Sequence, residues 1–546
     1  MKVQSIISYQ SNFKANYFTI EKRGKYYNLD KISTDNAEKL GEKPVLQANI
    51  QNVDCEFPML YDGKYYTTEL PSYVKKYRIF YKDTGKYENN GEEQSFNPML
   101  LKKIAVTEDR KFNKLPLEHS FAKGEASGKV FVNTFDIPKD MPVILVLDEV
   151  NNEETLILDV PHNVKGVITS SCDFGVLSHV ANLTRNRISA MSIIWDEDKY
   201  NNLKDLEGKY ISVNNESGVL EYNEVNPKST EIKFKPVEKV ELPKLENVER
   251  LLNFDELTPQ NCGNKGYRLG IMQKLVKEGK LRDINIPNGF VIPEGYINNF
   301  REYINIGDEE EVKKRILEGL YTQETENKIR ELGLPRRNLI IRSNFNTEDL
   351  GTFSSAGIYH SNCASTFGSI MLDTDDIVSY STDEEYNPIA KRTHNKYGIK
   401  NKDVRPSVIV QEYIQAPEYR FTLYTDDGDS NLIIELSDAN LGYLNPGNSL
   451  IKYNKKTKEL IQERKVSPFA EFVLDETGGI ISQKQTKDKI EENWDILKPM
   501  LGVVTSGALV LERFFQHPQD IEGGIKDGKV YFWQARDIVA KAVKRI

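Results

Sequence analysis

Cysteine is scarce in this sequence: a chain of 546 residues has four, and none forms a CxxC pair. This spacing indicates neither a cysteine-based structural zinc site nor a disulfide framework. The chain also lacks an uninterrupted apolar run of about 18 residues, and its first residues lack the apolar core of a signal peptide. We therefore expect reduced thiols, no membrane span and a cytoplasmic location.

Two common nucleotide-binding motifs are absent as well. The sequence has no GxxxxGK[ST] phosphate loop and no GxGxxG after a strand-like segment. The formal net charge of −9 indicates no basic surface for nucleic acid, so we expect no nucleic-acid partner. If the protein uses ATP, it must bind the nucleotide through a different architecture.

The length and the changes in composition indicate a multidomain protein of mixed α/β and α+β class. Residues 1–115 hold short strand-like pieces between DG and TG turns, which predicts a small β-rich N-terminal module. Residues 116–223 alternate strand-like and helix-like segments, as in an α/β domain with a central sheet. Residues 224–247 have the proline and charge of an extended linker, or of an edge strand, and residues 248–546 form a large α/β region.

In the C-terminal region, several segments carry side chains that suit a nucleotide site. Lys265 lies between glycines at a predicted helix start, where backbone N–H groups and a cation can meet phosphate oxygens. Arg342 ends an apolar strand, and its guanidinium suits bidentate phosphate binding. Gln411 and Glu412 end another apolar strand and are candidate partners for an adenine amino group or ribose hydroxyls. Taken alone, each residue also suits a surface or salt-bridge role.

The segment QDIEGGIKDGKVYFWQAR adds oxygen donors close to the C-terminus. Its Asp520, Glu522 and Gln534 are hard ligands of the kind that Mg²⁺ takes beside nucleotide phosphates. The KDGK sequence predicts a hairpin turn between two strands. Because Glu522 alone is equally explained as a hairpin charge, the argument depends on all of these segments together.

The segment GVLSHVANLTRN contains His179, one of six histidines in the chain. Ser178 precedes it and an apolar-periodic run follows, so His179 lies at the predicted start of a helix. A neutral imidazole is a nucleophile at pH 7, and a helix N-terminus stabilises added negative charge. Without its neighbours, such a histidine is more often a buried structural residue.

The C-terminal region resembles the ATP-binding domain of the pyruvate phosphate dikinase and phosphoenolpyruvate synthase superfamily, which has an ATP-grasp-like fold. The resemblance lies in NKGYRLGIMQKL with INIPNGFVIPEGY, in IIRSNFNTEDLGTFSSAGIYHS and in DIEGGIKDGKVYFWQAR. The motifs RSxxNxEDL and PQDIEG are most similar to those of the glucan, water dikinases. The resemblance implies ATP and Mg²⁺ as cofactors, with Mg²⁺ held by Glu522 and Gln534.

The segment GVITSSCDFGVLSHVANLTRNRISAMSI is similar to the phosphohistidine mobile domain of the same superfamily, whose pattern is TxxGGxxSHxAxxAR. The resemblance implies that His179 carries the phosphoryl group. It also implies that Thr169, Ser178 and Arg185 hold the phosphate, and that this domain swivels on the linker.

Together these features predict a phosphotransferase, a dikinase. Lys265 and Arg342 would clamp the ATP phosphates, and Arg536 would stabilise the transferring group. His179 would take the β-phosphate of ATP with release of AMP and pass it to an acceptor hydroxyl. By resemblance this acceptor is a glucan, which residues 1–115 would help to position, and the γ-phosphate goes to water.

Two alternatives stay open. The chain could phosphorylate another small hydroxyl compound, or it could bind ATP and regulate a partner with weakened catalysis. Two departures from the family pattern motivate the regulatory alternative: CDFG stands at the glycine pair before the histidine, and NLGYLNPG places Tyr443 where a glutamate is expected. The sequence does not indicate an oligomeric state.

Overall fold

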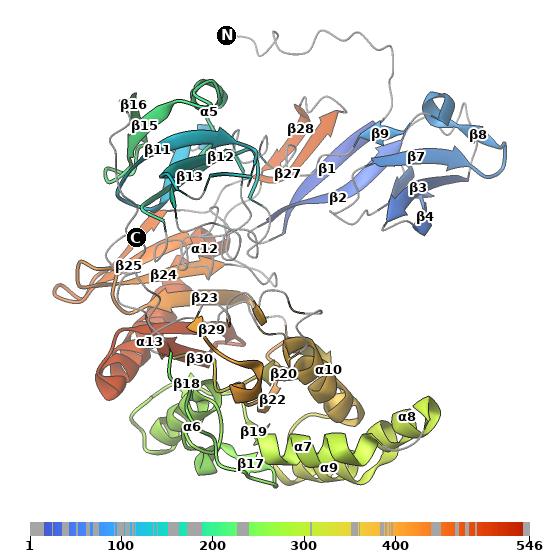
Figure 1. Ribbon diagram of the computed structural model, residues 1–546, viewed down its shortest axis with the longest axis vertical. Helices are drawn as coiled ribbons and strands as arrows, with labels where there is room; N and C mark the ends of the chain where they lie inside the picture. The colour runs from blue at the N-terminus through green and yellow to red at the C-terminus, as the bar shows by residue number, and fades with distance from the viewer. Residues whose placement is uncertain are drawn as a thin grey trace. The chain divides into compact units, whose positions relative to one another are not determined.

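Figure 1 shows the computed structural model, in which the chain has mixed α/β structure. The chain divides into two compact units, one of Met1–Leu117 with Ser467–Asp488 and one of Glu118–Val466 with Lys489–Ile546. The structure describes residues 16–23, 26–34, 43–50, 53–61, 66–68, 76–91, 93–95, 103, 107, 110–111, 114, 116–134, 136–138, 140–150, 163–171, 188–226, 240–305, 308–350, 359, 361–382, 387, 390–391, 394, 397–415, 417–437, 449–464, 469–475, 480–485 and 489–538.

The first unit contains two antiparallel sheets. One has the strand order β28-β27-β1-β2-β6-β5, built from β1 (Asn16–Arg23), β2 (Tyr26–Thr34), β5 (Leu60–Tyr61), β6 (Tyr66–Thr68), β27 (Phe469–Asp475) and β28 (Ile480–Gln485). The other has the order β4-β3-β7-β8, with β9 paired to β7, built from β3 (Pro44–Ile50), β4 (Val53–Pro58), β7 (Lys76–Tyr81), β8 (Lys86–Tyr87) and β9 (Gln94–Ser95).

The sheet that contains β1 combines strands from distant parts of the sequence. Strand β1 pairs with β27, with Tyr17 opposite Asp475, and Figure 1 shows the orange β27 and β28 beside the blue β1. The predicted N-terminal module is therefore completed by a hairpin from the C-terminal region. The sequence indicated strands in residues 1–115 but not this pairing.

The second unit begins with a sheet of order β10-β14-β13-β12-β11-β15-β16. Strands β11 to β14 are parallel, and their buried runs include VILVL and AMSII, as the sequence predicted. The predicted helix after β13 falls in residues 172–187, outside the described residues. The elements are β10 (Glu118–Ala122), β11 (Glu125–Val132), β12 (Val143–Leu147), β13 (Val164–Thr169), β14 (Ala190–Ile194), α5 (Glu197–Lys204), β15 (Tyr210–Asn214) and β16 (Glu221–Glu224).

The rest of this unit has two further sheets. A five-stranded sheet has the order β17-β19-β22-β20-β21, from β17 (Leu252–Asn253), β19 (Gly289–Ile292), β20 (Leu339–Ser343), β21 (Ser361–Ser365) and β22 (Val408–Glu412). A seven-stranded sheet has the order β18-β30-β29-β23-β24-β25-β26, from β18 (Ile284–Asn285), β23 (Tyr419–Tyr424), β24 (Asn431–Ser437), β25 (Ser449–Asn454), β26 (Leu460–Arg464), β29 (Gln519–Lys526) and β30 (Lys529–Asp537).

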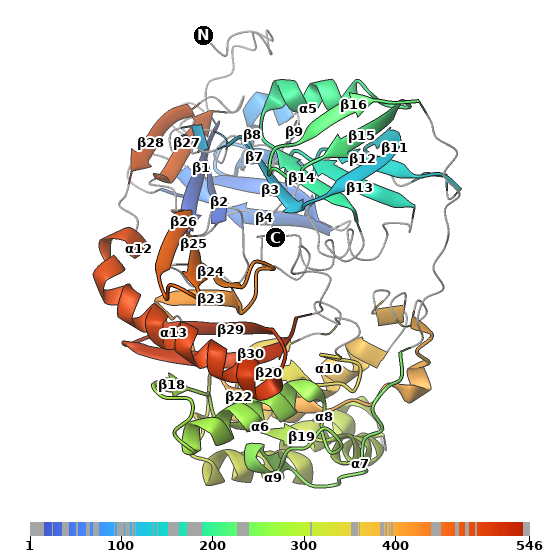
Figure 2. The ribbon, with the colours of Figure 1, turned by 90° about the vertical axis from the view of Figure 1, so that its left-hand side faces the viewer.

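Helices cover these two sheets in two separate cores. Because side chains alternate along a strand, Phe290 and Ile292 of β19 enter one core and Val291 enters the other. The core that contains Phe290 and Ile292 also contains residues of α7 (Glu294–Ile304), α8 (Glu309–Glu318), α9 (Leu320–Glu331) and α10 (Ile370–Thr382). The core that contains Val291 also contains residues of α6 (Asn264–Lys277), α12 (Lys489–Glu492), α13 (Trp494–Phe515) and the seven-stranded sheet. Figure 2 shows α13 along this sheet.

Helix α13 is apolar enough, by length and composition, to cross a membrane, with a mean hydropathy of 1.3 over 18 of its residues. Its side chains Leu497, Leu501, Val504 and Ala508 recur at intervals of three or four residues and are buried in the core against β29 and β30. This face of α13 is part of the core, while 39% of the apolar window as a whole is buried.

Two helical glycines differ sharply in the space around them, which gives a test of the packing of α6. A Cβ at Gly270 would overlap the carbonyl oxygen of Phe254, whereas a Cβ at Gly502 of α13 would meet no atom within 4 Å. We expect Gly270→Ala to lower the free energy of unfolding by about 1–3 kcal/mol. Gly502→Ala should instead raise it by about 0.5–1 kcal/mol through helix propensity. Denaturant melts of both variants check this, and equal effects would contradict the packing of α6.

Candidate active site

Arg342 joins the two C-terminal sheets. It lies in β20, is 7% exposed, and donates a hydrogen bond from Nη1 to the carbonyl oxygen of Trp533 over 2.7 Å. Its Nη2 donates to Oε1 of Gln534, and its Nη1 lies 3.5 Å from Oε1 of Gln411. Arg342 thus contacts β22 in its own sheet and β30 in the neighbouring sheet, so one guanidinium holds three strands at the predicted phosphate site.

Lys265 in the first turn of α6 reaches the loop that follows β20. Its Nζ lies 2.5 Å from Oε2 of Glu348 and donates to the carbonyl oxygen of Ser343 over 2.9 Å. Glu348 is fixed in turn, because its Oε1 accepts from the backbone N–H of Phe345 over 2.9 Å. Since Ser343 follows Arg342 in the chain, Lys265 contacts the end of β20 directly after the other predicted phosphate-binding cation.

The glycines around Lys265 have a packing role that the sequence did not predict. A Cβ at Gly266 would lie 2.8 Å from Nδ2 of Asn344, and a Cβ at Gly263 would overlap the backbone of the same residue. The N–H of Gly266 donates to Oδ1 of Asn344 over 2.8 Å. One of the N–H groups that we expected at the phosphate is therefore used to cap α6 with the loop after β20.

Arg536 is surrounded by carboxylates. Its Nε and Nη2 each lie 2.8 Å from Oδ2 of Asp520, its Nη2 lies 3.8 Å from Oε1 of Glu522, and its Nη1 lies 3.9 Å from Oδ1 of Asp349. Burial lowers the pKa of Arg536, but these carboxylates more than offset that effect and raise it. Arg536 therefore stays charged, within a cluster that carries more negative than positive charge.

The carboxyl of Asp520 is buried within this cluster. Burial raises the pKa of its carboxyl to about 6, and the charges of Glu522 and Asp349 add to the rise that Arg536 opposes. Among the described residues, Oδ1 of Asp520 and Oδ2 of Asp349 are buried without a hydrogen-bond partner. Asp349 also has a left-handed backbone, with φ of 52°, a conformation that is unusual outside glycine.

Glu522 and Gln534, the two predicted metal ligands, are opposite each other in the ladder of β29 and β30. Glu522 is half-buried and Gln534 is 6% exposed. The described residues contain no group of three or more His, Cys, Asp or Glu side chains placed to hold a metal ion. A carboxylate and an amide oxygen on neighbouring strands would suit a Mg²⁺ ion only if nucleotide phosphates and water supplied its remaining ligands.

The two residues predicted to contact adenine or ribose, Gln411 and Glu412, lie at the end of β22. Gln411 is 1% exposed, and its Nε2 donates to the carbonyl oxygen of Pro287 over 3.0 Å. Glu412 is half-buried, and its N–H donates to the carbonyl oxygen of Asn288 over 2.9 Å. The side chain of Gln411 thus supports Arg342 and the start of β19, and its contact with adenine stays a prediction.

In the sheet of residues 118–226, Thr169 lies at the carboxyl end of β13, and its hydroxyl donates to the carbonyl oxygen of Ser171 over 2.9 Å. Asp148 at the end of β12 accepts from Nζ of Lys204 over 2.8 Å and from Nδ2 of Asn133 over 2.7 Å. Burial raises the pKa of Asp148, but these hydrogen bonds lower it overall. The sequence did not indicate Asp148, although ligands of open α/β sheets commonly bind at this edge.

His179, Ser178 and Arg185 lie outside the described residues.

Part of the predicted linker is fixed on the C-terminal region. Val240 and Leu242 pack against its core, and the carbonyl oxygen of Pro243 accepts from Nδ2 of Asn346 over 3.1 Å. Glu224 is the last residue of β16. Of the predicted linker, residues 227–239 lie outside the described residues.

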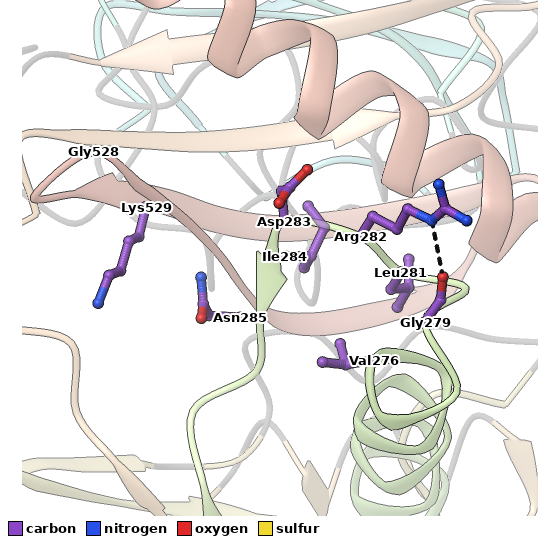
Figure 3. Close-up of a pocket in the computed structure, with 9 residues that line it drawn as sticks. All are labelled: Val276, Gly279, Leu281, Arg282, Asp283, Ile284, Asn285, Gly528 and Lys529. Atoms are coloured by element: carbon purple, nitrogen blue, oxygen red, sulfur yellow. Dashed lines mark hydrogen bonds between the residues drawn. The ribbon is translucent and has the colours of Figure 1, made fainter.

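A pocket of about 540 Å³ lies away from these residues, beside the loop after α6 and the turn between β29 and β30 (Figure 3). One of its cations, Arg282, donates from Nε to the carbonyl oxygen of Gly279 over 3.3 Å. None of the predicted site residues is in its lining, which consists of Val276, Gly279, Leu281, Arg282, Asp283, Ile284, Asn285, Gly528 and Lys529.

Residues 260–545, more than half of the chain, match the family described as "Pyruvate phosphate dikinase, AMP/ATP-binding domain". The chain belongs to this dikinase family. Residues 131–231 match a second family, "Alpha-glucan water dikinase, phosphohistidine-like domain". The Arg342, Lys265 and Arg536 contacts all lie within the first match, and Thr169 lies within the second. The two matches support ATP binding and a dikinase-type phosphotransfer.

Among curated proteins, this dikinase-family chain is similar to "Alpha-glucan water dikinase 2" of Arabidopsis thaliana, with 20% identity over 441 residues, which cover 72% of this chain and 33% of the relative. It is also similar to "Alpha-glucan water dikinase 1, chloroplastic" of the same plant, with 24% identity over 451 residues, which cover 73% and 30% of the two chains. The chain thus spans about a third of the length of these relatives.

Two solved structures are more distant. C-terminally truncated Cdc123 from Schizosaccharomyces pombe is 12% identical, covering 50% of this dikinase-family chain and 83% of that chain, with a TM-score of 0.24. D-Alanine-D-Alanine ligase from Helicobacter pylori is 9% identical, covering 51% and 60%, with a TM-score of 0.21. TM-scores this low do not establish a shared fold.

Proposed function

We propose that this protein is an ATP-dependent dikinase that passes the β-phosphate of ATP through His179 to an acceptor hydroxyl, with release of AMP and phosphate. The observation that carries the proposal is the presence, in one chain, of a phosphohistidine-like segment and an ATP-binding domain. The clustering of Lys265, Arg342 and Arg536 supports the second of these assignments. An ATP-grasp-like fold for this domain is part of the proposal.

In the proposed reaction, an imidazole nitrogen of His179 attacks the β-phosphorus of ATP. The bond from the β-phosphorus to the bridging oxygen of AMP breaks, and AMP leaves. Water then removes the terminal phosphoryl group as phosphate, and the acceptor hydroxyl takes the remaining group from the imidazole. One difficult transfer is thereby divided into easier steps.

The charges of the site define what the protein contributes to this reaction. Arg342 and Lys265 would hold the phosphate oxygens, and Arg536 would stabilise the group in transfer by a fixed positive charge. ATP brings further negative charge to a site where carboxylates already outnumber cations by four to three, so Mg²⁺ bound by Glu522 and Gln534 would supply the missing positive charge. These carboxylates are Glu348, Asp349, Asp520 and Glu522.

The carrier segment needs to reach two places, the nucleotide and the acceptor. Thr169 at the end of β13, with Ser178 and Arg185, would hold the phosphate on His179. The swivel would depend on residues 227–239, because Val240 and Leu242 are already packed on the ATP-binding domain. A fully extended stretch of 13 residues spans at most about 45 Å, which is shorter than the full predicted linker would allow.

For the acceptor we propose a glucan, on the strength of the names of the two plant relatives. The unit that contains residues 1–117 and 467–488 would help to position it. The two alternatives differ in the reaction. Another small hydroxyl compound would still take the phosphoryl group from His179, whereas a regulatory role requires ATP binding without transfer. The segments CDFG and NLGYLNPG that motivated the regulatory role lie outside the described residues.

Labelling with β-³²P ATP and Mg²⁺ tests the proposal. We expect AMP release and protein label that is labile in acid and stable in base, as for a phosphohistidine. Added soluble α-glucan should take up the label, and EDTA should abolish labelling. ATP binding without AMP or label would support the regulatory role. Label that leaves only with a small hydroxyl compound would overturn the glucan assignment while the dikinase assignment stands.

A further inference from the structure

Arg268 lies on α6 one turn after Lys265 and binds the opposite half of the candidate site. Its Nη1 donates to Oε1 of Gln519 over 2.8 Å, and its Nη2 lies 2.7 Å from Oδ2 of Asp537. Its guanidinium carbon lies 4.2 Å from the ring centroid of Phe515. These three partners are the last residue of α13, the first of β29 and the last of β30. The side chain of Arg268 therefore links α6 to the end of α13, the start of β29 and the end of β30.

The partners of Arg268 are adjacent to two residues of the site. Gln519 and Asp537 are opposite each other in the strand ladder, and Nε2 of Gln519 donates to Oδ1 of Asp537 over 2.8 Å. The next pair in the same ladder is Asp520 and Arg536, which form the buried ion pair. Because a strand advances only about 3.4 Å per residue, a displacement at the first pair moves the second.

Gln519, which Arg268 binds, is held by further hydrogen bonds. The backbone N–H of Gln519 donates to Oγ1 of Thr425 over 2.8 Å, and its side-chain amide also donates to the carbonyl oxygen of His517 over 2.8 Å. The side chain of Arg268 is 10% exposed, so its contacts with Gln519 and Asp537 are shielded from solvent. A planar guanidinium can serve both partners at once, which an ammonium on a flexible stem does poorly.

Lys265 and Arg268 of one helix thus contact the two sides of the site. Lys265 binds Glu348 and Ser343 in and after β20, and Arg268 binds the ends of β29 and β30. We infer that Arg268 is a positioning residue that sets Lys265 at the correct distance from Asp520 and Arg536. The inference rests on the proposed function, because it assumes that these residues together bind the ATP phosphates.

Three variants and one control test this inference. Arg268→Met keeps the apolar part of the side chain but removes the guanidinium, and Arg268→Lys keeps the positive charge. The third variant combines Arg268→Met with Asp537→Asn, so that the carboxylate of Asp537 is not left without its ion-pair partner. We expect Arg268→Met to lower kcat for AMP release at saturating Mg·ATP by roughly 10- to 100-fold. Arg268→Lys should be intermediate. Lys274→Met, which removes a 66%-exposed cation of the same helix, should stay within about twofold of the unchanged chain.

The double variant separates positioning from folding. We expect Arg268→Met/Asp537→Asn to recover most of the Tm lost in Arg268→Met while kcat stays low, because α6 is still not tied to the strand ends. Recovery of both Tm and kcat would overturn the inference and leave Arg268 a purely structural role. So would an Arg268→Met variant with full kcat.

If the unchanged protein releases no AMP, the proposed function fails, and calorimetry with Mg·ATP then tests the inference by itself. Arg268→Met should weaken the affinity for Mg·ATP several-fold, and Lys274→Met should not.

Discussion

With His179 replaced by alanine, incubation with β-³²P ATP is expected to leave the protein unlabelled. AMP release should fall by roughly a thousandfold or more, because the substitution removes the nucleophile and no other step replaces it. Affinity for Mg·ATP should be unchanged, since His179 lies in the segment 131–231 and the nucleotide site lies within 260–545. Scintillation counting of the denatured protein and calorimetry with ATP measure the two quantities.

The control for this variant is His517→Ala. His517 is half-buried, and its Nδ1 has only a long contact of 3.4 Å with the carbonyl oxygen of Pro518. Its removal is expected to leave labelling within about twofold of the unchanged chain. Label that persists in His179→Ala with the same acid lability would place the phosphoryl group on another residue and contradict the carrier assignment.

A change of Arg342 to lysine is expected to lower AMP release by about 100- to 1000-fold while the chain stays folded. The guanidinium of Arg342 bridges β20 to Trp533 and Gln534 of β30, and the same fork would hold phosphate oxygens. Lysine keeps the positive charge but cannot span both strands and a phosphate, so preorganised charge stabilisation is lost. Single-turnover AMP release, with Tm from circular dichroism, measures the effect.

Arg337→Lys serves as the matched control, because Arg337 is exposed and lies five positions earlier in the same segment. Its AMP release should stay within about twofold of the unchanged chain. If Arg342→Lys kept full AMP release with an unchanged affinity for Mg·ATP, Arg342 would be only a link between the sheets. If it lost its cooperative melt, the structural contribution of Arg342 would dominate instead.

Local elements of the C-terminal region were predictable from sequence. The segment NKGYRLGIMQKLVKEG predicted a helix, and α6 covers Asn264–Lys277. The KDGK turn predicted a hairpin, and Asp527 and Gly528 join β29 to β30 with φ of 50° and 69°. Both depend on residues close in sequence, so periodicity and turn residues suffice to predict them.

The candidate site was predictable only as a set of residue types. Lys265, Arg342, Asp520, Gln534 and Arg536 were all named from their segments, and the structure brings them into connected contacts. Their roles in catalysis stay predictions. The sequence did not single out the residues that hold them, namely Asn344, Glu348 and Asp349 in the loop after β20 and Arg268 on α6.

The sequence by itself indicated the dikinase family and local elements such as α6 and the β29–β30 hairpin, and it supplied the predicted cations, oxygen donors and carrier histidine. Only the tertiary structure decided that β27 completes the sheet of β1, that Asn344 caps α6, and that Arg268 binds Gln519 and Asp537. The physical reason is that a hydrogen bond or ion pair depends on distance in space. Several remote partners of suitable chemistry are available in the sequence, and only packing selects among them.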